Sequence, residues 1–132
     1  MKGININDSQ TPWTELILSG RKTIETRKSN SLRPYLNQRV GIIQTGKGQA
    51  HLVGYMTLGT PKIYNTIEEF RTDEPLHQVE DGNVFDWIGP KYGYPIYDVE
   101  RTEPKPITTR GIVAREISER HILNFNEFLM IK

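Results

Sequence analysis

Three charged side chains in one short segment, Lys22, Glu25 and Arg27, have the types and spacing that could carry chemistry. Side chains alternate along a β-strand, so Glu25 and Arg27 would share one face with Thr23, while Thr26 would point to the other face. Lys22 lies at the turn before this strand and could reach the same surface. Cations held around a carboxylate are suited to binding a phosphate or a polar base edge. The alternative is a surface ion pair of little energetic value.

Basic side chains gather around this segment although the chain as a whole is nearly neutral. Its 132 residues hold 17 Lys and Arg against 16 Asp and Glu, which gives a formal net charge of +1. Residues 21–33 hold five basic side chains, and Glu25 is the only acid among them. The overall balance argues against a protein that grips duplex nucleic acid through a strongly basic composition. The local excess predicts a smaller nucleic-acid-binding surface.

Several kinds of chemistry are excluded by residues that the sequence lacks. There is no cysteine, which excludes disulfides, thiolate zinc sites, iron–sulfur clusters and cysteine nucleophiles. His51, His77 and His121 lie far apart without metal-ligand spacing, so we predict no metal site and expect each to be a surface or partly packed histidine. No nucleophile elbow or dinucleotide-binding motif is present, and we predict no cofactor.

The charged segment follows a predicted short helix over residues 11–20. Thr11 is expected to cap it, Pro12 suits the first helical position, and Gly20 can end it in the left-handed conformation. The stretch 23–27 is rich in β-branched residues and alternates in polarity, which predicts a strand. The charged residues are therefore expected at the exit of a helix and along the strand after it.

A second helix is predicted to begin at Thr66, where Glu69 completes a capping box. Ile67 and Phe70 would form its inward face, and Pro75 should end or restart it. Further strands are predicted over residues 39–45 and 51–59, joined by a hairpin loop, and over 111–117. The remaining predictions are irregular loops from Gly82 to Pro106 around one short strand near 96–99, and a final strand or terminal helix over 122–131.

These elements predict one α+β domain spanning residues 1–132, built as a small curled sheet or barrel with helices at its rim. No apolar run approaches the roughly 18 residues that a membrane span needs. The first residues lack the long apolar stretch of a signal peptide. We therefore expect a soluble, cytoplasmic protein without a membrane partner.

The same segment resembles the signature of a known family. Gly20-x-Lys22-x-x-Glu25-x-Arg27, preceded by Pro12-Trp13, is similar to the G-x-K-x-x-E-x-R motif of ASCH domains, which belong to the PUA-like superfamily. Looser similarities follow in the family's order, at Arg39–Ile43, Leu52–Met56 and Lys105–Gly111.

This resemblance implies a PUA-like β-barrel of about five to six strands with flanking short helices. It further implies a cleft lined by Lys22, Glu25 and Arg27 that binds RNA or a modified nucleotide. We add Trp13 and Tyr97 as a predicted aromatic wall, because bases stack on aromatic faces. The alternatives are a core position for Trp13 and a barrel-filling ring for Tyr97.

The resemblance also raises a hydrolase hypothesis. Some family members look like amidohydrolases acting on N4-acetylcytidine, with a Lys followed three positions later by a Thr nucleophile. Here that position is Glu25, so Thr23, on the predicted face of Glu25, would be the only substitute. Other members are linked to cleavage of single-stranded RNA, which needs an acid, a base and a phosphate clamp. Lys22, Glu25 and Arg27 could supply all three, with Lys22 and Glu25 as the catalytic residues.

A third hypothesis is an interaction module. The aromatic stretch 85–97 would then hold a protein partner, and changes at Lys22 would not affect the complex.

Overall fold

The computed structural model describes residues 1–118. The predicted strand or helix over 122–131 and His121 lie outside the described residues. The elements in chain order are β1 (Lys2–Asn7), α1 (Trp13–Leu18), β2 (Ile24–Arg27), the 3₁₀ turn η1 (Arg33–Tyr35), β3 (Arg39–Thr45), β4 (His51–Leu58), β5 (Lys62–Tyr64), α2 (Ile67–Thr72), α3 (Glu74–His77), β6 (Lys91–Pro106) and β7 (Ala114–Glu116).

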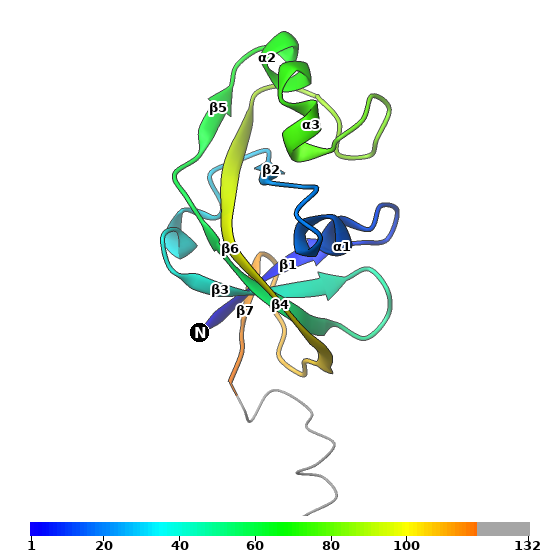
Figure 1. Ribbon diagram of the computed structural model, residues 1–132, viewed down its shortest axis with the longest axis vertical. Coiled ribbons are helices and arrows are strands. Elements are labelled where there is room, and N and C mark those ends of the chain that lie inside the picture. The colour runs from blue at the N-terminus through cyan, green and yellow to red at the C-terminus, as the bar shows by residue number, and fades with distance from the viewer. Residues whose placement is uncertain (119–132) are drawn as a thin grey trace, which may run out of the picture.

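The strands form one mixed sheet that curls into a half-barrel (Figure 1). Its order is β2-β6-β4-β3-β1-β7, and β5 also pairs with β6. The pair β1–β3 is parallel, and the other pairs are antiparallel. The predicted α+β architecture of a curled sheet with short helices is confirmed, with seven strands in residues 1–118 where about five to six were expected.

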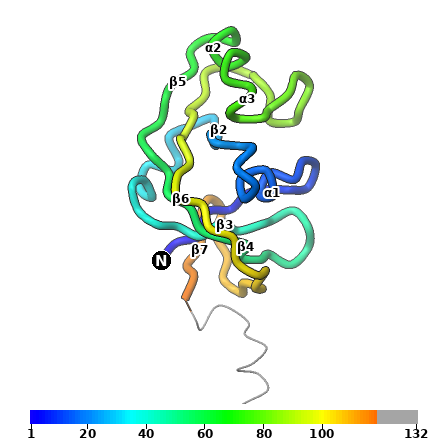
Figure 2. Tube along the Cα trace, in the orientation of Figure 1, coloured from blue at the N-terminus to red at the C-terminus, as the bar shows by residue number. Residues whose placement is uncertain are grey.

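The long strand β6 joins the two ends of the molecule (Figure 2). Its first half pairs with β2 and β5, and its second half pairs with β4. The prediction of irregular loops from Gly82 to Pro106 is therefore wrong for most of this stretch, because β6 has 16 residues. Register shifts against β4, one beside Asp98 at φ 51°, are β-bulges that bend the strand. Neighbouring strands thus impose an extended backbone on a sequence rich in turn residues.

Strand β1 has no counterpart among the predicted elements, yet it lies between β3 and β7 inside the sheet. Ile4 and Ile6 are buried in the main core and alternate with Gly3 and Asn5. This alternation is typical of a strand with one apolar face. Because β1 pairs with both neighbours, it holds the polar Asn5 between β3 and β7.

Helix α1 lies beside the sheet and begins without the predicted cap. Its N-cap is Pro12, and the carboxylate of the buried Asp8 accepts the N–H and hydroxyl of Thr14 instead. The Thr11 hydroxyl accepts a hydrogen bond from Asn83 Nδ2 at 3.0 Å, so the prediction for Thr11 is wrong. The predicted left-handed turn at Gly20, with φ 80°, is confirmed. It directs the chain from α1 toward β2.

The helices α2 and α3 cover the other end of the sheet. Thr66 accepts the N–H of Glu69 at 3.2 Å, as predicted, and α3 restarts at Glu74 with Pro75 in its first turn. Phe70 is buried, but Ile67 is 41% exposed, so only Phe70 forms the inward face. None of the helices in residues 1–118 is long and apolar enough to cross a membrane.

Candidate functional site

A cleft of about 480 Å³ opens beside β2, and the three charged residues singled out in the sequence line it together. Strand β1, the segment before β6 and the turn before β7 supply its other walls. A cavity of this size is typical of a small-ligand site. The predicted convergence of Lys22, Glu25 and Arg27 on one surface is thus present in the structure.

Lys22 is buried at the bottom of this cleft, with 2% of its surface exposed. Its backbone N–H donates to Leu16 at the end of α1, which fixes the turn that carries it. Its ammonium donates to the carbonyl of His77 at 2.6 Å and lies 3.8 Å from Glu25 Oε1. Burial lowers the pKa of Lys22 to about 8, although the nearby Glu25 carboxylate acts to raise it.

Glu25 and Arg27 lie side by side on β2. Arg27 Nη2 is 3.4 Å from Glu25 Oε2 and donates to the main-chain carbonyl of Asn5 at 2.9 Å. Glu25 Oε1 also accepts the backbone N–H of Thr26 at 3.0 Å. The carboxylate is therefore held between Lys22 and Arg27, and its two oxygens have fixed orientations.

Asn5 on β1 joins the charged segment to the end of the sheet. Its side-chain amide donates to the carbonyls of Gly111 and Ile112, and its side-chain oxygen accepts from Arg115 Nε at 2.9 Å. Because the Asn5 main-chain carbonyl binds Arg27, one residue positions two guanidinium groups of the cleft.

The charges that line the cleft do not balance. Glu25 is the one carboxylate among the described lining residues, and the cations are Lys22, Arg27, Lys28, Lys91 and Arg115. Lys91 is buried and donates to the carbonyl of Phe85, and this burial lowers its pKa. Lys28 is exposed and has no hydrogen bond or ion pair within residues 1–118. The cleft therefore presents positive charge that the surrounding protein does not neutralise.

Comparison with protein families assigns the chain. The model of the ASCH domain matches residues 9–128. The chain belongs to the ASCH domain family. Membership in this family supports a general RNA-binding, PUA-like domain. The comparison with curated proteins gives no match.

Solved ASCH structures share the fold. An ASCH protein from Zymomonas mobilis is 18% identical, with a TM-score of 0.63 over 78% of this chain and 71% of that chain. A point variant of that protein is 13% identical, with a TM-score of 0.69 over 98% of this chain and 94% of that chain. At these identities the likeness concerns the fold alone.

The two aromatic residues predicted to line the ASCH cleft lie in different places. Trp13 lines the cavity but is only 4% exposed, and Lys22 Nζ lies 4.5 Å from its ring centroid. Tyr97 is 52% exposed and is not among the residues that line this cavity. It follows the buried Ile96 on β6, so strand alternation turns it to the outer face.

Two further expectations about side chains near the ASCH signature are wrong. Thr26 lines the cleft and Thr23 does not, because β2 begins at Ile24 and Thr23 still belongs to the preceding turn. His77 is not a surface histidine: it is fully buried and stacks on Phe70, with ring centroids 4.1 Å apart. Its Nδ1 accepts the N–H of Val79 and its Nε2 donates to the Phe70 carbonyl, while burial lowers its pKa.

The aromatic stretch proposed as a partner surface is mostly packed. Trp87, Tyr92 and Tyr94 contact the main core, which leaves Phe85 and Tyr97 as its exposed rings. The interaction-module hypothesis therefore has two exposed rings available to it. Phe85 lines the cleft, whereas Tyr97 lies outside it. Within residues 1–118 no group of His, Asp and Glu is arranged to hold a metal ion.

Sequence reasoning missed several residues that shape the ASCH cleft, namely Asn5, Phe85, Lys91 and Arg115. One signal was present for Asn5, since it alternates with Ile4 and Ile6 as a polar residue does in a strand. Phe85 was noticed only as part of the aromatic stretch 85–97 and was not assigned to the cleft. Lys91 and Arg115 carry no local signal, because only the pairing of distant strands brings them to the cleft.

Proposed function

We propose that this ASCH domain binds single-stranded RNA or a modified nucleotide in the cleft lined by Lys22, Glu25 and Arg27. The observation that carries the proposal is the charge of the cavity, where five cations face one carboxylate. A phosphate group is the anion that such an arrangement of Lys and Arg favours. The family's general RNA-binding role supports the same class of ligand.

The cations have different tasks in this proposal. Arg27 is fixed by Asn5 and Glu25, so its guanidinium is oriented before a ligand arrives. Lys28 is free to move and supplies a flexible phosphate contact. Lys22 and Glu25 lie deeper and offer a donor and an acceptor to a polar base edge. Exposed aromatic surface beside positive charge is typical of single-strand binding.

A binding assay with the full chain tests this proposal. Fluorescence anisotropy with a labelled single-stranded RNA should show binding that weakens as salt rises. Arg27→Gln is expected to weaken it at least about tenfold, because it removes an oriented phosphate ligand. Arg39→Gln is the matched control, since Arg39 also pairs with a glutamate, Glu100, but lies outside the cleft. Equal affinity of both variants and the wild type would contradict the proposal.

A second candidate is hydrolysis of single-stranded RNA or of an acylated nucleoside in the same cleft. The observation that favours it is Lys22, whose burial lowers its pKa to about 8 beside the Glu25 carboxylate. A group that titrates near the working pH is suited to proton transfer, and Glu25 provides the acceptor. Thr26 lies next to Glu25 in sequence and lines the cleft, so it provides a hydroxyl near this pair.

Product formation distinguishes the two candidates. The full chain would be incubated with single-stranded RNA and, separately, with N4-acetylcytidine, and the products separated by chromatography. If the neutral amine of Lys22 acts as a base, turnover should rise with pH and level off above about pH 8. Glu25→Gln and Lys22→Met should abolish it. Binding without any product over this pH range would leave the binding function and reject the hydrolase.

A further inference from the structure

Phe85, which lies in the loop before β6, is the partly exposed aromatic ring of the cleft. It is 40% exposed and lines the cavity, whereas its neighbour Trp13 is almost fully buried. The two rings meet edge to face, with centroids 6.3 Å apart. The ammonium of Lys22 lies over Trp13 as well. Trp13 is therefore already occupied by protein contacts, and Phe85 has the surface left for a ligand.

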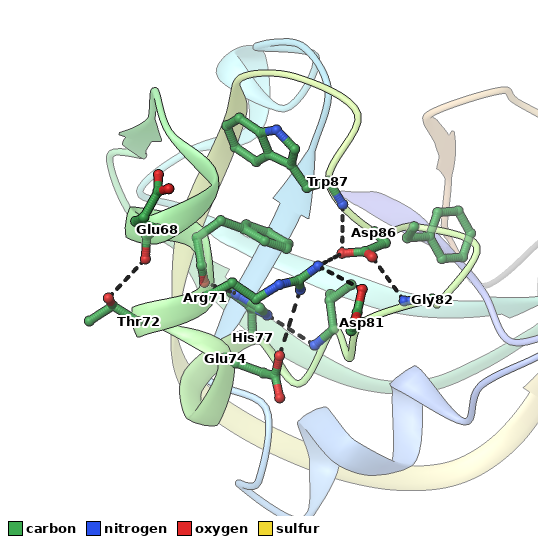
Figure 3. A network of polar contacts seen from close by, with 12 residues as sticks. Glu68, Arg71, Thr72, Glu74, His77, Asp81, Gly82, Asp86 and Trp87 are labelled. Carbon is green, nitrogen blue, oxygen red and sulfur yellow. Dashed lines mark hydrogen bonds and ion pairs between the residues drawn. The ribbon is translucent and has the colours of Figure 1, made fainter.

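A cluster of charged residues fixes the loop that carries Phe85. We define the Arg71 cluster as Arg71 with Glu74, Asp81 and Asp86 (Figure 3). Arg71 and Glu74 belong to the helices α2 and α3, while Asp81 and Asp86 belong to the loop. The guanidinium thus ties the loop to the helices on both sides of Phe85 in sequence.

Hydrogen bonds inside the loop add to this restraint. Asp86 accepts the backbone N–H groups of Gly82 at 2.9 Å and Trp87 at 2.7 Å. Burial acts to raise the pKa of Asp86, but these bonds and Arg71 outweigh it and lower the pKa to about 2. The main chain of Phe85 is bound at both ends, because its N–H donates to Asn83 and its carbonyl accepts from Lys91.

We propose that Phe85 is the platform on which a base of the bound nucleotide stacks, on a loop that the Arg71 cluster holds in place before binding. This inference rests on the proposed function and names the residue that recognises the base. A platform fixed in advance avoids the entropy cost of ordering a loop on binding. The cations of the same cavity would contact the phosphates, so the ligand combines a planar ring with negative charge.

The test compares two exposed aromatic residues. Binding of an RNA of about 12 nucleotides would be measured for the wild type, Phe85→Leu and Tyr97→Leu by fluorescence anisotropy. Phe85→Leu should weaken binding between about fivefold and about 100-fold, because leucine keeps an apolar side chain but removes the stacking surface. Phe85→Trp should restore it. Tyr97→Leu removes a ring of similar exposure outside the cavity and should have no effect.

A second probe separates base contacts from phosphate contacts. An abasic strand of the same length keeps the phosphates, so the wild type and Phe85→Leu should bind it equally, while Arg27→Gln should still weaken it. Thermal unfolding of each variant controls for folding. Wild-type affinity in Phe85→Leu, or a loss in Tyr97→Leu alone, would overturn this inference and leave the proposed function standing. Absence of binding by the wild type would overturn both.

Discussion

Two groups of charged residues, the Arg71 cluster and the cleft, contact the loop before β6, and they differ in charge balance. In the Arg71 cluster, one cation faces three carboxylates, and its guanidinium pairs with each of them. In the cleft, five cations face one carboxylate, and much of their hydrogen bonding goes to neutral carbonyls. The cation of the first group is paired with an excess of carboxylates, whereas the second group retains excess positive charge.

The difference distinguishes a structural site, whose buried charge is well paired, from a candidate binding site, whose buried charge is not. Arg71 holds a loop against two helices, so its interactions stabilise the fold. Lys22 is more deeply buried, yet its carbonyl and carboxylate partners do not offset the cost of burial, as its lowered pKa shows. Residues kept in such an unfavourable state are common at functional sites, where stability is given up for activity.

The largest expected effect is at Lys22. The pKa of Lys22 is about 8 in the folded protein and near 10.5 when unfolded, so the unfolded chain binds more protons between these values. Stability should therefore rise with pH across this window, by about 3 kcal/mol from this group alone. Lys22→Met removes this contribution, and at pH 7 it should leave the free energy of unfolding equal or higher while weakening RNA binding.

Urea denaturation of the wild type and Lys22→Met from pH 7 to 10.5 measures this effect. The pKa of Lys91 is also lowered by burial, but Lys91 is present in both proteins. The difference between the two curves thus isolates Lys22. Parallel curves would mean that burial in the folded protein does not lower the pKa of Lys22. The contrast between the cleft and the Arg71 cluster would then fail.

A smaller effect, in the opposite direction, is expected at Arg71. Arg71→Met leaves the partly buried Asp86 without its cation and should lower the free energy of unfolding by about 2 kcal/mol. Arg101→Met is the control, because Arg101 forms a two-fold hydrogen-bonded pair with Glu15 on the exposed surface. That variant should lose less than about 1 kcal/mol.

The dependence of protein stability on acidic pH gives a second test of the Arg71–Asp86 pair. Asp86 has its pKa lowered from 3.8 to about 2 in the folded protein, so its contribution is complete above pH 3.8 and is lost as pH falls through about 2. The stability gap between the wild type and Arg71→Met should therefore shrink between pH 4 and pH 2. A gap that stays constant would mean that the Arg71–Asp86 pair does not hold the loop.

The smallest effect is expected at the rim of the cleft. Lys28→Gln removes one mobile cation, so the slope of log affinity for single-stranded RNA against log salt should decrease by about 0.7, with affinity lowered only a few-fold. Lys105→Gln, which changes an exposed lysine at the far end of β6, should leave the slope unchanged. Thermal unfolding should be the same for both variants. Equal slopes would exclude Lys28 from the binding surface.

The sequence predicted the parts of the site that depend on local geometry. Glu25 and Arg27 are two residues apart on a strand, so alternation alone puts them on one face, and Gly20 supplies the turn that brings Lys22 to them. The family signature made the curled α+β sheet predictable as well.

The remaining parts depend on distant partners. Strand β6 is extended because β2, β4 and β5 pair with it, and no count of its glycines and prolines could show this. Thr11 was a reasonable cap, but the carboxylate of Asp8, which comes from the end of β1, reached the helix instead. Tyr97 was chosen as an aromatic residue near the site, without the buried neighbours that set its direction.

The contacts of Asn5 determine when the cleft can form during protein synthesis. One residue binds Arg27, 22 positions later in the chain, and Arg115, 110 positions later. Contacts over such separations form late in folding, because a long loop must close first. The complete cleft therefore cannot form until β7 has left the ribosome and can pair with β1. A nascent chain that lacks this strand has the signature residues without the site.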